Sequence, residues 1–142
     1  GVTPLAYEPL AQGLLTGKYH EHQHEAGPLP TNQYTYEELV LYRPIVNLMR
    51  LIGAFSLGKT TSQVALNYLM TKGAIPIPGV KNVAQAREVM GATGWRLSES
   101  DIEILDERLV EFDNEMARKG ALAKLGLNID IDELERILGV KG

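Results

Sequence analysis

Short apolar runs and longer segments of helical periodicity alternate along this chain. The apolar runs at residues 2–7 and 74–77 predict two buried strands. Between them, residues 36–57 have the 3.6-residue spacing of a helix with one apolar face. The side chains on that face are Leu39, Leu41, Ile45, Leu48, Met49, Ile52 and Phe55. Shorter helices are predicted over 61–72 and 83–90, and a further one begins at Ser98 with Ile102, Leu105, Leu109 and Phe112 on one face.

Capping signals delimit these helices. A Ser, Thr or Asn precedes each of them, and a Glu, Gln or Asp follows three residues later, which is the spacing of a capping box. The four pairs are Thr35 with Glu38, Thr60 with Gln63, Asn82 with Gln85 and Ser98 with Asp101. Gly58 and Gly73 stand where the first two helices are expected to end. A fifth pair, Asp130 with Glu133, predicts a short final helix that ends at Gly139.

The order strand, loop, helix, helix, strand, helix, helix is typical of an α/β fold with a parallel sheet. Two strands cannot cover four helices, so we expect the sheet to be incomplete. The chain also begins with Gly1 inside a strand-like segment. Both observations lead us to expect that the sequence is a fragment of a longer protein.

Composition removes several classes of function. The 142 residues carry a net charge of −4 and no cysteine. A negative chain does not favour a nucleic-acid partner held by a basic face, and without cysteine there is no disulfide, thiolate metal site or cysteine nucleophile. No apolar run approaches the roughly 18 residues of a membrane-spanning helix. We therefore expect neither a nucleic-acid nor a membrane partner.

The loop that follows the first strand carries the first candidate site. It holds Gly13, Gly17 and Lys18 within a few residues of the strand end. Glycine lets backbone N–H groups approach an anion, and lysine adds charge, so the segment could cradle a phosphate. An ordinary connection from a strand into a loop has the same composition, and this alternative remains open.

A second candidate site follows the second strand, at the sequence PGVKN of residues 78–82. The start of the next helix offers unpaired N–H groups and the positive end of a dipole, and Lys81 adds a full charge. Gln85 and Glu88 follow at steps of four and three, which puts them on the same helical face as Lys81. Gln85 could instead serve only as a capping residue, and Glu88 could be a solvated surface residue.

Taken together, these motifs resemble the aldo-keto reductase superfamily. The matching segments are AYEPLAQGLLTGKY at 6–19, QVALNYL at 63–69, IPIPGVKN at 75–82 and GWRLS at 94–98. The resemblance covers residues 1–118, the C-terminal half of that family's domain, and leaves residues 119–142 as a tail outside it. It implies a partial (β/α)8 TIM barrel that contains the last two strands, the seventh and eighth, and their helices.

The resemblance also implies NADP(H) as cofactor and a small carbonyl compound as substrate of the complete protein. In the family's pattern Tyr7 stacks on the nicotinamide and Glu88 contacts the adenine. The pyrophosphate is lined by Pro9, Leu10, Gly13 and Lys18. The adenosine phosphate is held by Gly79, Lys81 and Gln85. Two positions depart from the pattern: Glu8 replaces a small hydroxyl residue, and Val89 replaces an asparagine.

No motif of this chain matches the family's catalytic Asp, Tyr, Lys and His, which lie in the first half of the barrel. The resemblance therefore assigns no catalytic residue and no metal site here, and it predicts that the chain alone does not reduce carbonyl compounds. A non-catalytic NADP-binding or regulatory subunit on the same fold is the alternative. The sequences PGVKN and GWRL of the later motifs resemble a plastid-type branch of the family. The expected compartment is therefore the cytoplasm or the plastid.

Two further motifs offer other functions. Residues 53–60, GAFSLGKT, satisfy the Walker A pattern of nucleotide-binding loops. That motif must follow a buried strand, whereas the preceding residues have helical periodicity. Residues 20–25, HEHQHE, could bind a metal if they were extended, because alternate side chains then share one face.

Overall fold

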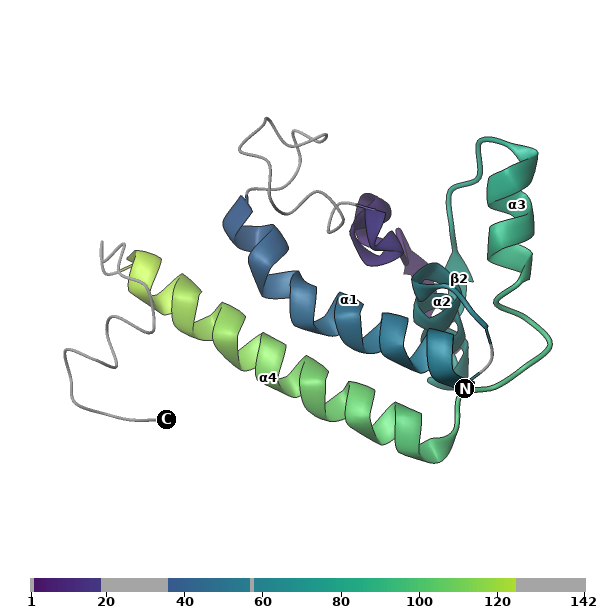
Figure 1. Cartoon of the computed structure of the whole chain (residues 1–142). Helices are drawn as coiled ribbons and strands as arrows, with labels where there is room; N and C mark the ends of the chain where they lie inside the picture. The colour runs from purple at the N-terminus through teal and green to yellow at the C-terminus, as the bar shows by residue number, and fades with distance from the viewer. Residues whose placement is uncertain (1, 19–35, 57, 125–142) are drawn as a thin grey trace. The chain divides into compact units, whose positions relative to one another are not determined.

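A computed structural model describes residues 2–18, 36–56 and 58–124, whose elements are drawn in Figure 1. The elements follow the predicted order. They are β1 (Leu5–Tyr7), the 3-10 segment η1 (Ala11–Thr16), α1 (Tyr36–Ser56), α2 (Thr61–Thr71), β2 (Ile75–Ile77), α3 (Val83–Met90) and α4 (Glu99–Lys124). The chain divides into two compact units, Gly1–Asp106 and Glu107–Gly142. Everything that bears on the candidate site belongs to the first unit.

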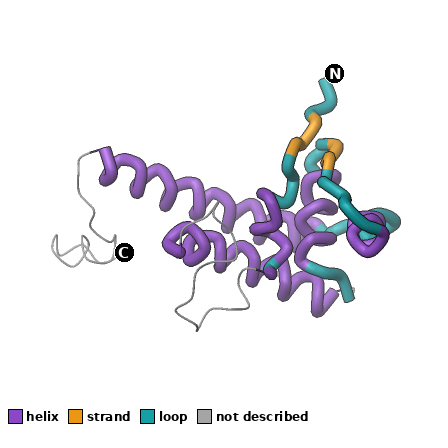
Figure 2. The backbone as a smooth tube through the Cα atoms, turned by 90° about the horizontal axis from the view of Figure 1, so that it is seen from above, coloured by secondary structure: helices purple, strands orange, loops and turns teal. Residues whose placement is uncertain are grey.

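The two strands pair in parallel, as the sequence predicted (Figure 2). The register places Leu5 opposite Ile75 and Tyr7 opposite Ile77. Each strand has three residues, so both are shorter than the apolar runs that predicted them. Because the strands are parallel and in register, the segments that follow Tyr7 and Ile77 leave the sheet at the same edge.

The prediction that these strands are buried is wrong for the described part of the chain. The side chain of Leu5 is 64% exposed and that of Tyr7 is 81% exposed. Within the described residues the sheet contains only β1 and β2, so no further strand covers their outer edges. Burying both faces of a parallel sheet requires more neighbours than this pair has.

The core of the first unit lies where α1, α2 and η1 pack together. Its fully buried large side chains include Leu14 of η1, Val46 of α1, and Val64 and Leu66 of α2. The apolar face predicted for α1 is largely correct. Phe55 is the exception: it was placed on the core face, but 85% of it is exposed at the end of the helix.

Helix α1 continues through Pro44, which lacks the N–H group of a helical hydrogen bond. Proline inside a helix costs about 3 kcal/mol. The same helix buries Leu39, Ile45, Met49 and Ile52, each worth about 1.5–3 kcal/mol when removed from water. Packing of this face therefore outweighs the proline, and the helix is not interrupted.

The capping signals predicted most helix starts correctly. Thr60 and Gln63 form both hydrogen bonds of a capping box on α2. The Asn82 side chain accepts the N–H of Gln85 on α3 at 2.9 Å, and Ser98 Oγ accepts the N–H of Asp101 on α4 at 3.1 Å. Helix α4 runs through Gly120 to Lys124. The predictions for Thr35 and for the helix after Asp130 fall outside the described residues.

A small polar cluster joins the end of α2 to the first part of α4. The Tyr68 hydroxyl donates to Asp106 at 2.5 Å, and the Lys72 ammonium pairs with the other oxygen of Asp106 at 2.5 Å. The hydrogen bond from Lys72, followed by that from Tyr68, holds the pKa of Asp106 below its ordinary value. Burial, together with the neighbouring Asp106 carboxylate, raises the pKa of Tyr68 above its ordinary range.

The Asp106 carboxylate should make stability depend on pH in the acidic range. Its pKa is lower in the folded chain than in the unfolded chain, where it is about 3.9. Its stabilising effect is therefore present above that pH and is lost as the pH falls towards the folded value. We expect Asp106→Asn to lower the melting temperature at neutral pH, and this difference to shrink below about pH 3.9. The exposed Asp113→Asn is the matched control, because it makes the same chemical change at another position of α4.

Candidate functional site

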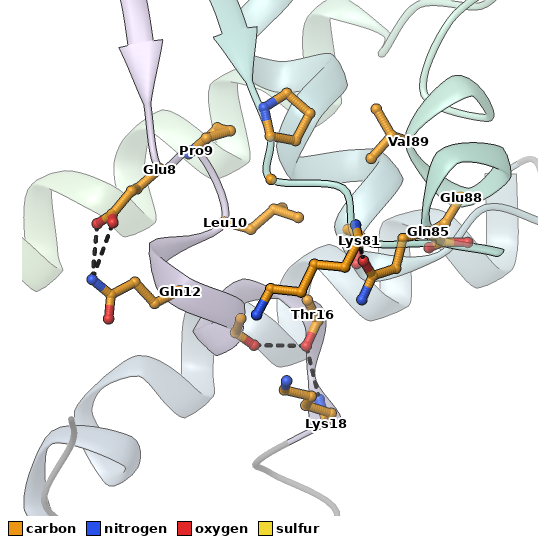
Figure 3. A pocket seen from close by; sticks show the side chains of 14 residues that line it. Glu8, Pro9, Leu10, Gln12, Thr16, Lys18, Lys81, Gln85, Glu88 and Val89 are labelled. Carbon is orange, nitrogen blue, oxygen red and sulfur yellow. Dashed lines mark hydrogen bonds between the residues drawn. The ribbon is translucent and has the colours of Figure 1, made fainter. Parts of the chain in front are cut away.

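A cavity of about 620 Å³ opens where β1 and β2 end (Figure 3). This volume is within the range of roughly 300–1,000 Å³ that is usual for small-molecule sites. One wall comes from the segment after β1 and the other from the segment after β2 and from α3. The lining residues are Glu8, Pro9, Leu10, Gln12, Gly13, Thr16, Lys18, Ser62, Pro78, Gly79, Lys81, Gln85, Glu88 and Val89.

The cavity brings together eight of the nine residues that the sequence selected for a cofactor site. They are Pro9, Leu10, Gly13 and Lys18 from the first segment and Gly79, Lys81, Gln85 and Glu88 from the second. Two segments about 70 residues apart thus meet in one site, because parallel strands end at the same edge of a sheet. Tyr7, the ninth, is the last residue of β1, is largely exposed and does not line the cavity.

Hydrogen bonds within the loop after β1 fix its shape. The N–H of Ala11 donates to Glu8 O at 2.8 Å, and the N–H of Gly13 donates to Leu10 O at 3.0 Å. Gly13 has a φ of 97°, a backbone conformation that favours glycine. These N–H groups are therefore engaged inside the loop. The glycine shapes the loop through its left-handed backbone, and its N–H donates within the loop.

The positive charge of the site comes from two lysines, one in each segment. Figure 3 shows the Lys81 side chain extending across the cavity towards the loop after β1, and Lys18 lies at the lower rim. Among the described residues, no carboxylate forms an ion pair with Lys81. A cation such as Lys81, which the described carboxylates leave unpaired, attracts an anionic ligand.

Side chains at the start of α3 fix the residue that carries this charge. The side-chain oxygen of Gln85 accepts the backbone N–H of Lys81 at 2.7 Å. The backbone N–H of Gln85 donates to the side-chain oxygen of Asn82. The capping alternative for Gln85 is thus realised in part, with the bond directed to Lys81 and not to the N-cap residue. This arrangement holds Lys81 at the N-terminal end of α3, where the helix dipole also favours an anion.

Glu88 contributes its carboxylate to a junction between α3 and α2. Thr60, the N-cap residue of α2, donates its hydroxyl to one oxygen of Glu88. Gln63 donates to the backbone oxygen of Glu88 at 3.1 Å and to its other carboxylate oxygen at 3.4 Å. Glu88 is therefore not the solvated surface residue of the alternative interpretation, because it anchors one wall of the cavity to the start of α2.

Glu8 also lines the cavity, and its carboxylate is bound to Gln12. The Gln12 amide nitrogen donates to the two carboxylate oxygens at 3.1 and 3.0 Å. In Figure 3 this pair lies on the side of the cavity away from Gln85 and Glu88. Both carboxylates of the site are thus engaged by neighbouring polar groups, and neither forms an ion pair with Lys81.

Sequence reasoning missed three polar residues of the lining: Gln12, Thr16 and Ser62. The Thr16 hydroxyl donates to Gly13 O at 2.6 Å and so stabilises the loop. Ser62 is buried in the first turn of α2 and reaches the cavity only because α2 packs against the loop and β2. Thr16 is next to Gly17 in the first motif, so its position was a usable signal, whereas nothing near Ser62 in the sequence indicated a site.

The alternative of a nucleotide-binding Walker A loop is wrong. Gly53 lies inside α1 and not after a strand. Lys59, the lysine of the pattern, lies 5.4 Å from the centre of the Trp95 ring and donates to Gly91 O at 3.4 Å. Its role is to hold the segment after α3. The histidine-rich segment 20–25 lies outside the described residues.

Among the helices of the described residues, none combines the length and the apolar character that crossing a membrane requires. Clusters of three or more His, Asp or Glu side chains that could hold a metal ion were likewise not found in that part of the chain.

Several oxidoreductases are similar to this chain. It is 36% identical over 107 residues to the chloroplastic pyridoxal reductase of Arabidopsis thaliana. The matched region covers 71% of this chain and 27% of that protein. It is 35% identical over 96 residues to an uncharacterised oxidoreductase of Mycobacterium tuberculosis, and that match covers 66% of this chain and 29% of the relative. An aldo-keto reductase of Strobilurus tenacellus is 30% identical over 109 residues, and that match covers 72% of this chain and 32% of the relative.

The chain thus spans about a third or less of the length of these relatives. The sequence pattern of the aldo/keto reductase family matches residues 1–110. This range includes both strands, the cavity between their ends and the helices up to the first half of α4. On this match, which covers most of its length, the chain belongs to the aldo/keto reductase family.

Proposed function

We propose that this chain is the NADP(H)-binding part of an oxidoreductase that reduces aldehydes or ketones by hydride transfer. Family membership implies a portion of a (β/α)8 barrel, and in the proposal β1 and β2 are its seventh and eighth strands. One observation carries the proposal. The cavity at the carboxyl ends of two parallel strands has a lysine across it, Lys81, with no carboxylate partner among the described residues.

The cofactor roles divide between the two segments of the cavity. In the proposal, the loop after β1 lines the pyrophosphate through Pro9, Leu10, Gly13 and Lys18. The segment after β2 holds the adenosine phosphate through Gly79, Lys81 and Gln85. Tyr7 and Glu88 contact the nicotinamide and the adenine. Support for the phosphate roles is chemical, since an ammonium group at a helix N-terminus suits a phosphate.

Glu88 acts in this proposal mainly through its bonds to Thr60 and Gln63, which support the wall beside the adenine. A carboxylate oxygen has a second lone pair, so the Glu88 carboxylate can still accept a hydrogen bond from the exocyclic amine of the adenine. Val89 beside it offers only an apolar surface to the ring.

The proposal assigns no acid–base residue to this chain. NADPH, when bound, would supply the hydride, and the proton that the reduced carbonyl oxygen requires would come from residues outside these 142. We therefore expect no carbonyl reduction by the 142 residues alone. The Arabidopsis relative is named for pyridoxal, which is an aldehyde, and this agrees with the proposed substrate class. That relative is also named as chloroplastic, which supports the plastid as the compartment over the cytoplasm.

Replacing Lys81 tests the proposal. Lys81→Ala should weaken binding of NADP+ by about 10- to 100-fold, since a charge-assisted hydrogen bond is worth about 1.5–3 kcal/mol. Binding of NAD+, which lacks the additional phosphate, should change little. The measurement is a calorimetric titration of the wild-type chain and the variant with each cofactor.

Lys59→Ala is the matched control, because it removes the same charge at a lysine that stacks over Trp95 outside the cavity. It should leave the affinity for NADP+ unchanged. Equal losses for NADP+ and NAD+ in Lys81→Ala, or no loss for either, would remove Lys81 from the phosphate site. Failure of the wild-type chain to bind NADP+ at all would contradict the proposed function.

A further inference from the structure

The pair formed by Glu8 and Gln12 addresses an electrostatic problem of the proposed site. Glu8 follows β1 directly and lines the same cavity as Lys18 and Lys81. If the cavity accepts a pyrophosphate, a carboxylate that faces it repels the ligand and competes with it for the lysines. The position of the Glu8 side chain therefore determines how favourable the cavity is for an anion.

Gln12 controls that position in the structure. Its amide nitrogen donates to both carboxylate oxygens of Glu8, at 3.1 and 3.0 Å. Figure 3 shows the carboxylate facing Gln12, while the Lys81 side chain occupies the middle of the cavity. Among the described residues Glu8 forms no ion pair with a lysine. The amide satisfies the carboxylate without using either cation of the site.

The backbone of the loop makes this pairing possible. Glu8 has a φ of 50°, Ala11 of 45° and Gln12 of 53°. Residues with a Cβ rarely adopt this left-handed region, which is unfavourable for them. The hydrogen bond from Ala11 N to Glu8 O closes a turn between the two residues, and so brings the Gln12 side chain back to Glu8. An unfavourable conformation thus supports a specific side-chain contact at the edge of the cavity.

We infer that Gln12 is a positioning residue, which keeps the Glu8 carboxylate turned away from a phosphate group bound in the cavity. This inference rests on the proposed function, because it concerns the same anionic ligand. Gln12 acts through Glu8 and needs no contact of its own with the ligand. It has a direct consequence: the effect of substituting Gln12 depends on the charge at position 8.

A double-mutant cycle with NADP+ as the probe tests this dependence. In Gln12→Ala the carboxylate is released, and the affinity for NADP+ should fall by about tenfold. In a Glu8→Gln background position 8 carries no negative charge that could repel the ligand, so adding Gln12→Ala should change the affinity for NADP+ less than about twofold. Glu8→Gln alone should bind NADP+ at least as tightly as the wild-type chain.

Salt provides a readout that a structural role of Gln12 does not share. The loss in Gln12→Ala should diminish at high ionic strength, since the Debye length falls from about 10 Å at 0.1 M salt to about 3 Å at 1 M. If Gln12 only stabilised the loop, the loss would be the same in both backgrounds and at both salt concentrations. That result, or no loss in Gln12→Ala, overturns the inference while the proposed function stands.

Folding of each variant is checked by circular dichroism and by the fluorescence of Trp95, the single tryptophan of the chain. If Gln12→Ala does not fold, Glu8→Gln decides the question alone. A loss of NADP+ affinity in Glu8→Gln contradicts the inference, because removing the charge must not weaken the site. If the wild-type chain binds no NADP+, the proposed function fails, and the inference fails with it.

Discussion

Asn67→Asp is expected to lower the free energy of unfolding by about 4 kcal/mol, because it places an unpaired charge in the core. Asn67 lies in α2 and is only 2% exposed. Its amide nitrogen donates to Ala92 O at 3.0 Å and to Trp95 O at 2.9 Å, and its oxygen accepts the N–H of Leu97 at 3.1 Å. An aspartate turns an oxygen towards two carbonyl oxygens and loses both donated bonds.

Chemical denaturation followed through Trp95 fluorescence measures this effect. Asn47→Asp makes the same chemical change on the exposed side of α1 and should alter stability by less than about 0.5 kcal/mol. Asn67→Ala, which removes the bonds without adding charge, should fall between the two at about 3 kcal/mol. A loss below about 1 kcal/mol for Asn67→Asp would mean that the segment 92–97 is not held by α2.

Gly53→Ala is the second substitution with a large expected effect, a loss of about 2 kcal/mol. A Cβ at this buried position of α1 would collide with the backbone oxygen of Lys59 and would lie 3.1 Å from Val64 Cγ2. Alanine gains about 1 kcal/mol in helix propensity over glycine. Relieving the collision must shift the segment that leads into Thr60, the N-cap residue of α2, and the cost of this shift exceeds that gain.

The same denaturation experiment tests Gly53→Ala, with Gly79→Ala as control. A Cβ at Gly79 meets no atom of the described residues within 4 Å, and the backbone there is not left-handed. It should therefore leave the midpoint of unfolding nearly unchanged. An unchanged or higher stability of Gly53→Ala would show that helix propensity outweighs the close approach of Lys59 to α1.

Local chemistry made most of the fold predictable. The capping boxes at Thr60 and the N-caps at Asn82 and Ser98 depend on residues three positions apart, and all of them start helices as expected. The parallel pairing followed from the order of the elements. The burial of individual side chains was less predictable. The spacing of Phe55 in the sequence places it on the apolar face of α1, but the side chain is exposed in the structure. Its burial depends on tertiary packing at the end of the helix, which spacing does not indicate.

The site was predictable where its residues flank the strand ends. Pro9, Gly13, Gly79 and Lys81 are close in sequence to β1 or β2, so strand topology brings them to one edge. Gln12 was missed because its orientation depends on left-handed conformations at non-glycine residues, which residue type does not signal. Ser62 was missed because it reaches the cavity through the packing of α2, a long-range property.

The most direct test of the central claim is to map where NADP+ binds on the chain. Amide chemical shifts of the ¹⁵N-labelled chain would be recorded by NMR during a titration with NADP+. The largest changes are expected at residues 8–18 and 79–89, the two segments that line the cavity. With NAD+ the changes near Lys81 should be smaller. No change at saturating NADP+, or changes centred on residues 53–60, would contradict the central claim.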